Sequence, residues 1–310
     1  MNIKDISDRI HTERQLKAVT GLSLQQFLIL LPVFDEFLIA QKEENKVNKL
    51  KPNNGNKGTL KTATDKLLFI LHYLKCYPTF DQLGFMFNMN GSNAHTLLYK
   101  LFPILTQTLN HLNVLPKTGF KTPEEMREAF KDIDTLVIDA TERAVQRPQD
   151  EEEQTAHYSG KKKKHTNKNT VIASLHFVIL YVGITFPGKN HDFGMFKKEF
   201  KPGLNWFTNF NIFIDLGYKG FDKNYQVKNL FIPHKKPNKS KNNPNPRLTQ
   251  IQKDENKEMS KIRVVVENVI GGMKRFRCLV ERFRNHITYV KDLVILIASG
   301  IWNFNIANRA

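Results

Sequence analysis

Apolar residues recur at helical spacing through most of the first third of the chain. "LSLQQFLILLPVFDEFLIA" opens with Ser23, a suitable N-cap, and "ATDKLLFILHYLKCY" has the same amphipathic pattern. Between them, the Lys/Asn-rich segment 43–62 contains Pro52, Gly55 and Gly58, which predicts a flexible loop or linker. The pattern therefore predicts an α-helical N-terminal domain over residues 1–120.

The stretch "PTFDQLGFMFNMNGSNAHTLLYKLFPIL" has the layout of a helix-turn-helix. Pro78 begins a short helix, "NMNG" provides the turn, and Ser92 caps a second helix, so we place the motif at about residues 65–105. An ordinary helical hairpin explains this stretch about equally well. The exposed side chains of the second helix that can reach base edges or phosphates are Asn93, His95 and Lys100.

The second part of the chain changes to short apolar runs rich in β-branched and aromatic residues. "TLVIDA", "NFNIFIDLGYKGF" and "NLFIPHK" predict strands, and "TVIASLHFVILYVGITF" predicts two paired strands with a turn near Val182–Gly183. "DFGMFKKEF" predicts a short helix. A lysine-rich loop (235–258) then leads into a long helix (258–284) and a C-terminal helix (about 290–308). Strands followed by helices predict an α/β domain over residues 130–310.

The charge of the chain indicates its partner. The 310 residues have a formal net charge of +17 and a pI of about 9.7. Such an excess favours a polyanion, and we expect double-stranded DNA. No membrane is expected, because "LVILIASGIW" is well short of the roughly 20 apolar residues that span a bilayer. The two cysteines, far apart in sequence, make neither a zinc motif nor a disulfide framework, so we expect a cytoplasmic protein.

Two aspartates follow apolar strand patterns directly. Asp139 ends "TLVID" and Asp215 ends "NIFID". In open sheets, groups just beyond the strand ends share one crevice, so the two carboxylates can meet there. For either aspartate alone, a turn or N-cap role is the simpler explanation.

A third carboxylate, Glu267, lies in the helical stretch "RVVVENVIGGMK". At 100° per residue, Arg263 is offset from Glu267 by about 40° and Lys274 by about 20°, so the three share one face. Beside them runs an apolar stripe that includes Val266 and Val269. The simpler alternative is a solvated charged face, in which an Arg–Glu pair contributes a few tenths of a kcal/mol.

Three carboxylates without a histidine or cysteine cluster suit hard divalent cations. Two Mg²⁺ or Mn²⁺ ions held in this way would activate a water or hydroxyl and stabilise the leaving oxygen in phosphodiester cleavage. Cations such as Arg263 and Lys274 would neutralise the phosphate and hold the strand. On a basic chain with a helix-turn-helix, this predicts a nuclease-like enzyme acting on DNA.

Five motifs occur in an order that is similar to a known family. They are "VIDATERAVQRP", "HYSGKKKKHT", "GKNHDFGMF", "IDLGYKGF" and "RVVVENVIGGMKRFR". The chain resembles the DDE transposases of the insertion-sequence-five group, which are related to the Harbinger-type nucleases. The resemblance implies a ribonuclease-H-like catalytic domain, a mixed sheet flanked by helices, preceded by the helix-turn-helix domain. It assigns metal binding and catalysis to Asp139, Asp215 and Glu267.

The resemblance also implies an activity. A transposase of this group binds the terminal inverted repeats of its element, hydrolyses phosphodiesters at the ends and joins the freed 3′-hydroxyl to target DNA. We expect it to work as a homodimer on DNA, associated with a prokaryotic nucleoid. Two alternatives remain: a non-catalytic DNA-binding protein derived from a transposase, and an endonuclease that cuts without strand transfer.

Two further motif regions are interpreted through the resemblance. Around the glutamate, the family pattern is Tyr, two residues, Arg, three, Glu, six, Lys; Arg263, Glu267 and Lys274 match it, but Ser260 replaces the tyrosine and offers no ring to stack. "SGKKKKHT" forms a basic loop that can bind backbone phosphates, although a solvated charged loop is nearly as good an explanation. The residues of this loop are Lys161, Lys162, Lys163, Lys164 and His165.

Overall fold

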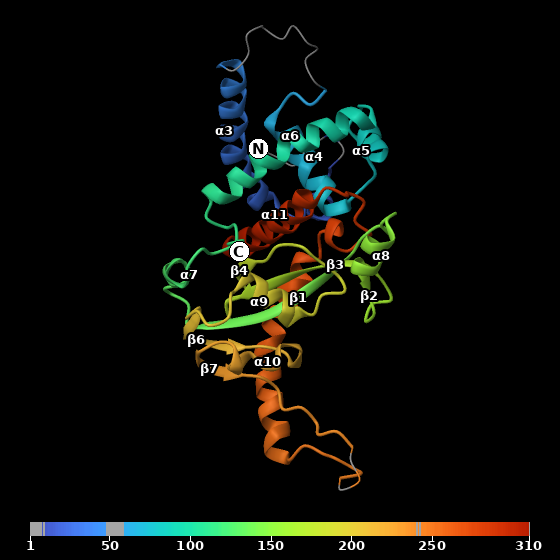
Figure 1. The fold of residues 1–310 in the computed structure, drawn as a ribbon. Coiled ribbons are helices and arrows are strands. Elements are labelled where there is room, and N and C mark those ends of the chain that lie inside the picture. Colours follow the sequence, from blue (N-terminus) through green and yellow to red (C-terminus); the bar gives the residue numbers. More distant parts are fainter. Residues whose placement is uncertain (1–7, 9, 48–58, 240, 242, 310) are drawn as a thin grey trace. The chain divides into compact units, whose positions relative to one another are not determined.

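The computed structural model describes residues 8, 10–47, 59–239, 241 and 243–309 (Figure 1). Its contacts divide the chain into two compact units. The helical unit comprises Met1–Leu115 and Met273–Ala310, and the sheet unit comprises Pro116–Gly272. Residues 273–310, which the sequence interpretation placed in the second domain, thus group with the N-terminal helices.

The helical unit is built from amphipathic helices with well-defined starts. The side chains of Thr12, Thr62 and Thr79 each accept a hydrogen bond from the backbone N–H three residues on, which stabilises the first turn. Its elements are α2 (Glu13–Thr20), α3 (Leu24–Val47), α4 (Ala63–Cys76), α5 (Phe80–Met86), α6 (Gly91–His111), the 3₁₀ turn η3 (Arg277–Leu279) and α11 (Thr288–Ala307).

The two helices predicted first are confirmed. Ser23 precedes α3 and its hydroxyl accepts from the N–H of Gln26 at 3.2 Å, as expected of an N-cap. α3 extends to Val47, into the segment 43–62 that was predicted as a linker. Residues 48–58 of that segment lie outside the described residues.

The helix-turn-helix layout is present as α5 and α6, but the predicted cap is wrong. Asn90, not Ser92, caps α6: its side-chain oxygen accepts from the N–H of Asn93 at 2.7 Å. The turn is tight at Gly84, where a β-carbon would lie 2.5 Å from the carbonyl oxygen of Met89. Only glycine leaves room for that approach.

Two helices of this unit, α3 and α11, are long and apolar enough to cross a membrane by length and composition alone. α11 is longer than the ten-residue apolar run suggested. Most of its apolar window is buried inside the protein, including Val294, Ile297 and Ile301. A buried core helix needs the same composition, so packing explains the apolar character of α11.

The sheet unit holds a mixed sheet whose strands run in the order β2-β3-β1-β6-β7, with β4 and β5 paired to β3. β1 is antiparallel to β3 but parallel to β6, and β6 is parallel to β7. The mixed sheet with flanking helices confirms the predicted fold class. The strands are β1 (Thr135–Ala144), β2 (Tyr158–Ser159), β3 (Lys164–Ala173), β4 (Ile179–Val182), β5 (Phe186–Pro187), β6 (Phe207–Phe213) and β7 (Val227–Phe231).

Helices and 3₁₀ turns surround this sheet (Figure 1). They are α7 (Pro123–Ala129), α8 (Glu151–His157), α9 (Asp192–Glu199), η1 (Leu216–Tyr218), η2 (Phe221–Lys223) and α10 (Gln250–Met273). An aromatic core joins α9 to the sheet, because Phe196 packs between Phe200, Phe207 and Phe221, with ring centroids 4.8–5.6 Å away. This core supports the loop that follows Asp215.

Three predicted boundaries in this unit are wrong. β1 does not end at Asp139 but continues to Ala144, paired with β3 throughout. The turn between β3 and β4 lies at Ser174–Phe177, where the N–H of Ser174 donates to the carbonyl of Val178, rather than near Val182–Gly183. α10 begins eight residues before and ends eleven residues before the predicted span 258–284. Gly271 and Gly272, poor helix formers, lie at its C-terminal end.

Candidate active site

Asp139 and Asp215 occupy matching positions on neighbouring strands. The parallel pairing of β1 with β6 ends at Val137 opposite Phe213, and each aspartate lies two residues further along its own strand direction. Beyond that pair β1 goes on with β3 alone, while the chain after β6 turns into η1. The two carboxylates therefore lie at the same edge of the parallel pair, as predicted, although Asp139 is inside a strand.

The surroundings of Asp139 favour the protonated form of its carboxyl group over the ionised form. Its pKa is raised to about 6, chiefly by burial and to a smaller extent by the charges of Asp215 and Asp192. The N–H of Ala140, which donates to Oδ1 at 2.7 Å, and the guanidinium of Arg263 act in the opposite direction. A cation placed beside this carboxyl would favour its ionised form.

Glu267 reaches the same region from α10 through Arg263. The Nη2 atom of Arg263 lies 3.4 Å from Oδ1 of Asp215 and 3.9 Å from Oε1 of Glu267. Val266 and Val269 are buried on the adjoining face, which fixes the rotation of the helix. The guanidinium thus links the acid after β6 to the acid on α10, and its charge also acts on Asp139.

The donor set fits a hard divalent cation in its chemistry. Asp139, Asp215 and Glu267 offer oxygen donors only, as Mg²⁺ and Mn²⁺ prefer. In the described part of the chain, no three Asp, Glu, His or Cys side chains are gathered into one ligand set. The side chains of Asp215 and Glu267 are 47% and 58% exposed, so they can rotate away from Arg263 toward a cation.

Sequence reasoning missed Lys168, which binds Asp192, and Tyr218, which lies near Asp139. Lys168 on β3 contacts Asp192 of α9 at 3.0 Å and the carbonyl of Asn190 at 2.9 Å. The hydroxyl of Tyr218 is buried without a hydrogen-bond partner among the described residues, and its pKa is raised first by burial and then by nearby charges that include Asp139 and Asp215. The spacing of Tyr218 from Asp215 in "DLGY" was the available signal.

Comparisons with known proteins show the family of the chain. A family model described as "DDE superfamily endonuclease" matches residues 138–303, a range that contains all three acids. The chain belongs to the DDE superfamily of endonucleases. A second model, "Helix-turn-helix of DDE superfamily endonuclease", matches residues 59–111, which include α5 and α6. The DNA-binding interpretation of this stretch is thereby favoured over the ordinary hairpin.

One curated relative of this DDE endonuclease matches along nearly its whole length. It is described as "Probable transposase for insertion sequence element IS702", from Microchaete diplosiphon. The identity is 28% over 300 residues, which cover 96% of this chain and 97% of the relative. No solved structure matches.

The cations predicted to bind DNA in the endonuclease lie in different settings. Lys161, Lys162 and Lys163 lie in the exposed turn between β2 and β3, where Lys163 adopts φ 54° and its N–H donates to the carbonyl of Ser159. Lys164, also exposed, is the first residue of β3. His165 follows on β3 against the ring of Tyr158. Lys274 lies beyond the end of α10, so the predicted common helical face of Arg263, Glu267 and Lys274 does not extend to it.

The predicted base-reading side chains lie in the helical unit. Asn93, His95 and Lys100 are all exposed on α6, as the pattern predicted. The ring of His95 also contacts Phe80 and Tyr99, with centroids 4.9 and 4.5 Å away. His95 is therefore held in place by the α5–α6 packing, whereas Asn93 and Lys100 project more freely.

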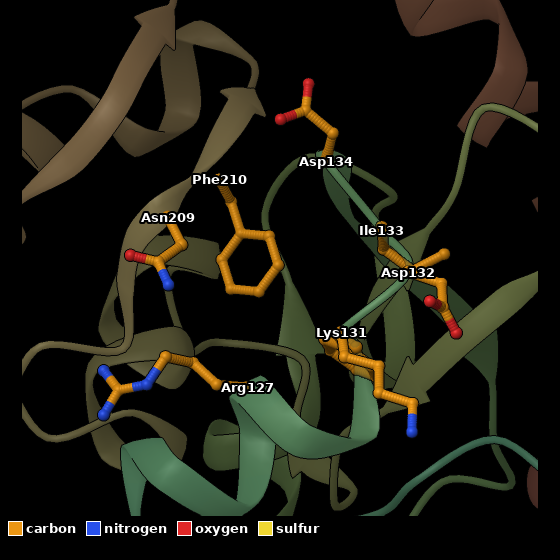
Figure 2. A pocket seen from close by; sticks show the side chains of 8 residues that line it. Arg127, Lys131, Asp132, Ile133, Asp134, Asn209 and Phe210 are labelled. Atoms are coloured by element: carbon orange, nitrogen blue, oxygen red, sulfur yellow. The ribbon is translucent and has the colours of Figure 1, made fainter.

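A cavity of about 310 Å³ lies in the sheet unit near the starts of β1 and β6. Figure 2 shows its lining, with Asp132 and Asp134 on one side and Asn209 and Phe210 on the other. Asp134 is already bound by Lys228 at 2.8 Å. Because this cavity lies at the opposite ends of the strands from Asp139 and Asp215, it plays no part in the candidate active site.

The raised pKa of Asp139 predicts how stability depends on pH in metal-free protein. Its pKa is about 6 in the fold but about 3.9 when unfolded, so between these values the folded state holds more of the proton. The free energy of unfolding therefore falls as pH rises from about 4 to about 6. Above about pH 6 the fold carries the full cost of keeping Asp139 ionised while it is buried. The isosteric change Asp139→Asn removes this cost and keeps an oxygen for the Ala140 N–H.

We therefore expect the stability gained by Asp139→Asn to grow from about pH 4 to about pH 6 and then to level off. Urea unfolding of both proteins in a chelator, at several pH values, measures this difference. A difference that stays constant or shrinks with rising pH would show that burial does not disfavour the charge at Asp139.

Proposed function

We propose that this endonuclease is a transposase of the insertion-sequence-five group, which binds the terminal inverted repeats of its own element, cleaves its ends and joins them to target DNA. The observation that carries the proposal is the position of Arg263, whose Nη2 atom lies 3.4 Å from Asp215 and 3.9 Å from Glu267 and whose charge lowers the pKa of Asp139. The helix-turn-helix match, the relative described as a probable transposase and the ordered motifs support it.

In this proposal the three acids hold two Mg²⁺ or Mn²⁺ ions. When bound, such ions activate a water or 3′-hydroxyl and stabilise the leaving oxygen of the phosphodiester. Asp139 would hold an ion in its ionised form, and the proton it carries in metal-free protein would pass to solvent. Arg263, freed from Asp215 and Glu267, donates to a phosphate oxygen of the strand being cut.

The remaining predicted DNA contacts are of two kinds: those that position the sugar–phosphate backbone and those that read the base sequence. The sugar–phosphate backbone is held by the β2–β3 turn, by the start of β3 and by the residue after α10, that is, by Lys161, Lys162, Lys163, Lys164, His165 and Lys274. Asn93, His95 and Lys100 on α6 contact the terminal repeat. We propose a homodimer on DNA, so that the two ends of one element are held together, in the nucleoid of a prokaryotic cell.

The test uses the DNA that flanks the gene. Purified protein is incubated with a labelled duplex that carries the flanking sequence, a supercoiled target and Mg²⁺ or Mn²⁺. A transposase nicks or cuts the duplex at one defined position and yields products joined to the target. Cutting without joining would favour the endonuclease alternative, and binding without cutting would favour the non-catalytic DNA-binding protein.

Asn93→Ala is expected to weaken binding to the terminal-repeat duplex by about 1–3 kcal/mol and to leave binding to a scrambled duplex unchanged, because an amide that reads a base carries sequence information. Lys100→Ala is expected to weaken binding to both duplexes by the same factor, because a phosphate contact does not discriminate between sequences. Fluorescence anisotropy with the two duplexes measures both effects.

The matched control is Gln107→Ala, an exposed change near the other end of α6. It should bind both duplexes as the unaltered protein does. Equal losses for Asn93→Ala and Gln107→Ala would mean that the N-terminal part of α6 does not read the DNA.

A further inference from the structure

The segment 274–289, "KRFRCLVERFRNHITY", follows the catalytic helix α10 but folds with the helix-turn-helix. Its apolar side chains attach it there. Phe276, Cys278, Leu279 and Phe283 are all buried, and the ring of Phe283 stacks on that of Tyr77 at the end of α4. The segment is therefore an ordered part of the helical unit and not a linker.

Polar contacts fix the segment to the turn that joins α4 and α5. Nη2 of Arg284 donates to the carbonyls of Tyr77 (3.0 Å) and Pro78 (2.7 Å), and its guanidinium lies 4.2 Å from the centre of the Tyr77 ring. The Tyr77 hydroxyl accepts from the N–H of Arg284 at 2.9 Å. Because Tyr77 has a left-handed φ of 51°, these bonds stabilise the turn that orients the helix-turn-helix.

The segment also reaches α6 directly. The side-chain amide of Asn285 donates to the hydroxyl of Tyr99 on α6. The ring of Tyr99 in turn contacts that of His95, one of the side chains predicted to face DNA. The basic segment and the predicted reading helix thus share a hydrogen-bonded contact.

The segment carries a large positive charge with little acid to balance it. It contains one lysine and four arginines but a single carboxylate, Glu281, which lies 3.4 Å from Arg277. Arg275 and Arg282 are exposed and have no carboxylate partner in the described residues. Burial and the charges of Arg275 and Arg277 lower the pKa of Lys75 on α4, which donates to the carbonyl of Arg275 at 2.8 Å. Cations are crowded here, and a polyanion would relieve their repulsion.

We propose that residues 274–289 form a second DNA-contacting surface of the helix-turn-helix unit, in which Arg275 and Arg282 bind backbone phosphates of the duplex that α6 reads. The inference rests on the proposed function, because it takes the same terminal DNA as the ligand. Phosphate contacts position a protein on a duplex without reading its sequence. This surface raises the affinity of the protein for the duplex and fixes the orientation of the helix-turn-helix on it. In the sequence, it begins directly after the helix that carries Glu267.

The double change Arg275→Ala/Arg282→Ala tests this in the full-length protein. Binding to the terminal-repeat duplex and to a scrambled duplex is measured over a range of NaCl concentrations. Removing two phosphate contacts should reduce the magnitude of the slope of log K against log[salt] by about 2, where K is the binding constant. Binding to the two duplexes should weaken by the same factor. Arg275→Lys/Arg282→Lys keeps the charges and should restore the slope.

The control Arg14→Ala/Lys42→Ala removes two exposed cations from α2 and α3 of the same unit. It should leave the slope unchanged, and circular dichroism should show the same fold for all variants. A slope equal to that of the unaltered protein in Arg275→Ala/Arg282→Ala would overturn the inference alone. Unaltered protein that binds neither duplex would overturn the proposed function, and this inference with it.

Discussion

Replacing Asp139 by alanine is expected to lower metal-dependent DNA cleavage by about 1000-fold or more. A carboxylate that holds a catalytic cation contributes several kcal/mol to the transition state, and each 1.36 kcal/mol changes the rate about tenfold. Asp139 is the most buried of the three acids, and burial raises its pKa. Single-turnover cleavage of a labelled element end measures the loss.

Glu142→Gln is the matched control on the same strand. Glu142 lies three residues after Asp139, on the opposite face of β1 by strand alternation, and its Oε1 accepts from the hydroxyl of Thr166 at 2.6 Å. A glutamine keeps that bond, so cleavage should stay within a few-fold of the original. If Asp139→Ala cut DNA as fast as Glu142→Gln, Asp139 would have no part in the reaction.

Phe196→Ala is expected to destabilise the sheet unit by about 3–5 kcal/mol, because a fully buried phenylalanine is lost and its neighbours cannot fill the space. Phe196 has no exposed surface, and its ring also packs against Tyr218, three residues after Asp215. The change therefore loosens the same loop that positions one of the three acids.

The two tryptophans make this measurement specific to one unit. Trp206 lies in the sheet unit and Trp302 in the helical unit, so Trp302→Phe leaves fluorescence that reports the sheet unit alone. Urea unfolding in that background, with and without Phe196→Ala, gives the difference in unfolding free energy. Phe85→Ala, at a phenylalanine that is 87% exposed, should change almost nothing. Equal effects of the two changes would contradict the packing described for α9.

Local patterns were sufficient for most elements. α4, α9, α11 and β7 follow from apolar spacing and from the residues that cap or end them, because these signals act within a few residues. β1 was cut short at Asp139 because its second half, "ATERA", looks polar. Thr141 and Arg143 are nevertheless buried, and only the pairing with β3 makes them strand residues. The burial of Arg143 depends on Asn169 of β3, 26 residues further along the chain, to which its guanidinium donates a hydrogen bond.

The site could be anticipated only in part. The motif order selected the three acids as candidates, and helical periodicity placed Arg263 beside Glu267. The register of β1 against β6, the reach of Arg263 to Asp215 and the burial that raises the pKa of Asp139 all depend on tertiary packing. The prediction that Lys274 shares a helical face with Glu267 was wrong, because the apolar pattern continues past Met273, where α10 ends.

The central claim is that Asp139, Asp215 and Glu267 act together as one metal centre, and Mn²⁺ binding tests it without knowledge of the DNA sequence. Electron paramagnetic resonance titration counts free Mn²⁺ against each protein. We expect the unaltered protein to bind Mn²⁺, and Asp139→Asn, Asp215→Asn and Glu267→Gln each to weaken binding by about tenfold or more, while Glu142→Gln binds normally. The account would be contradicted if any one of the three variants bound Mn²⁺ as tightly as the unaltered protein.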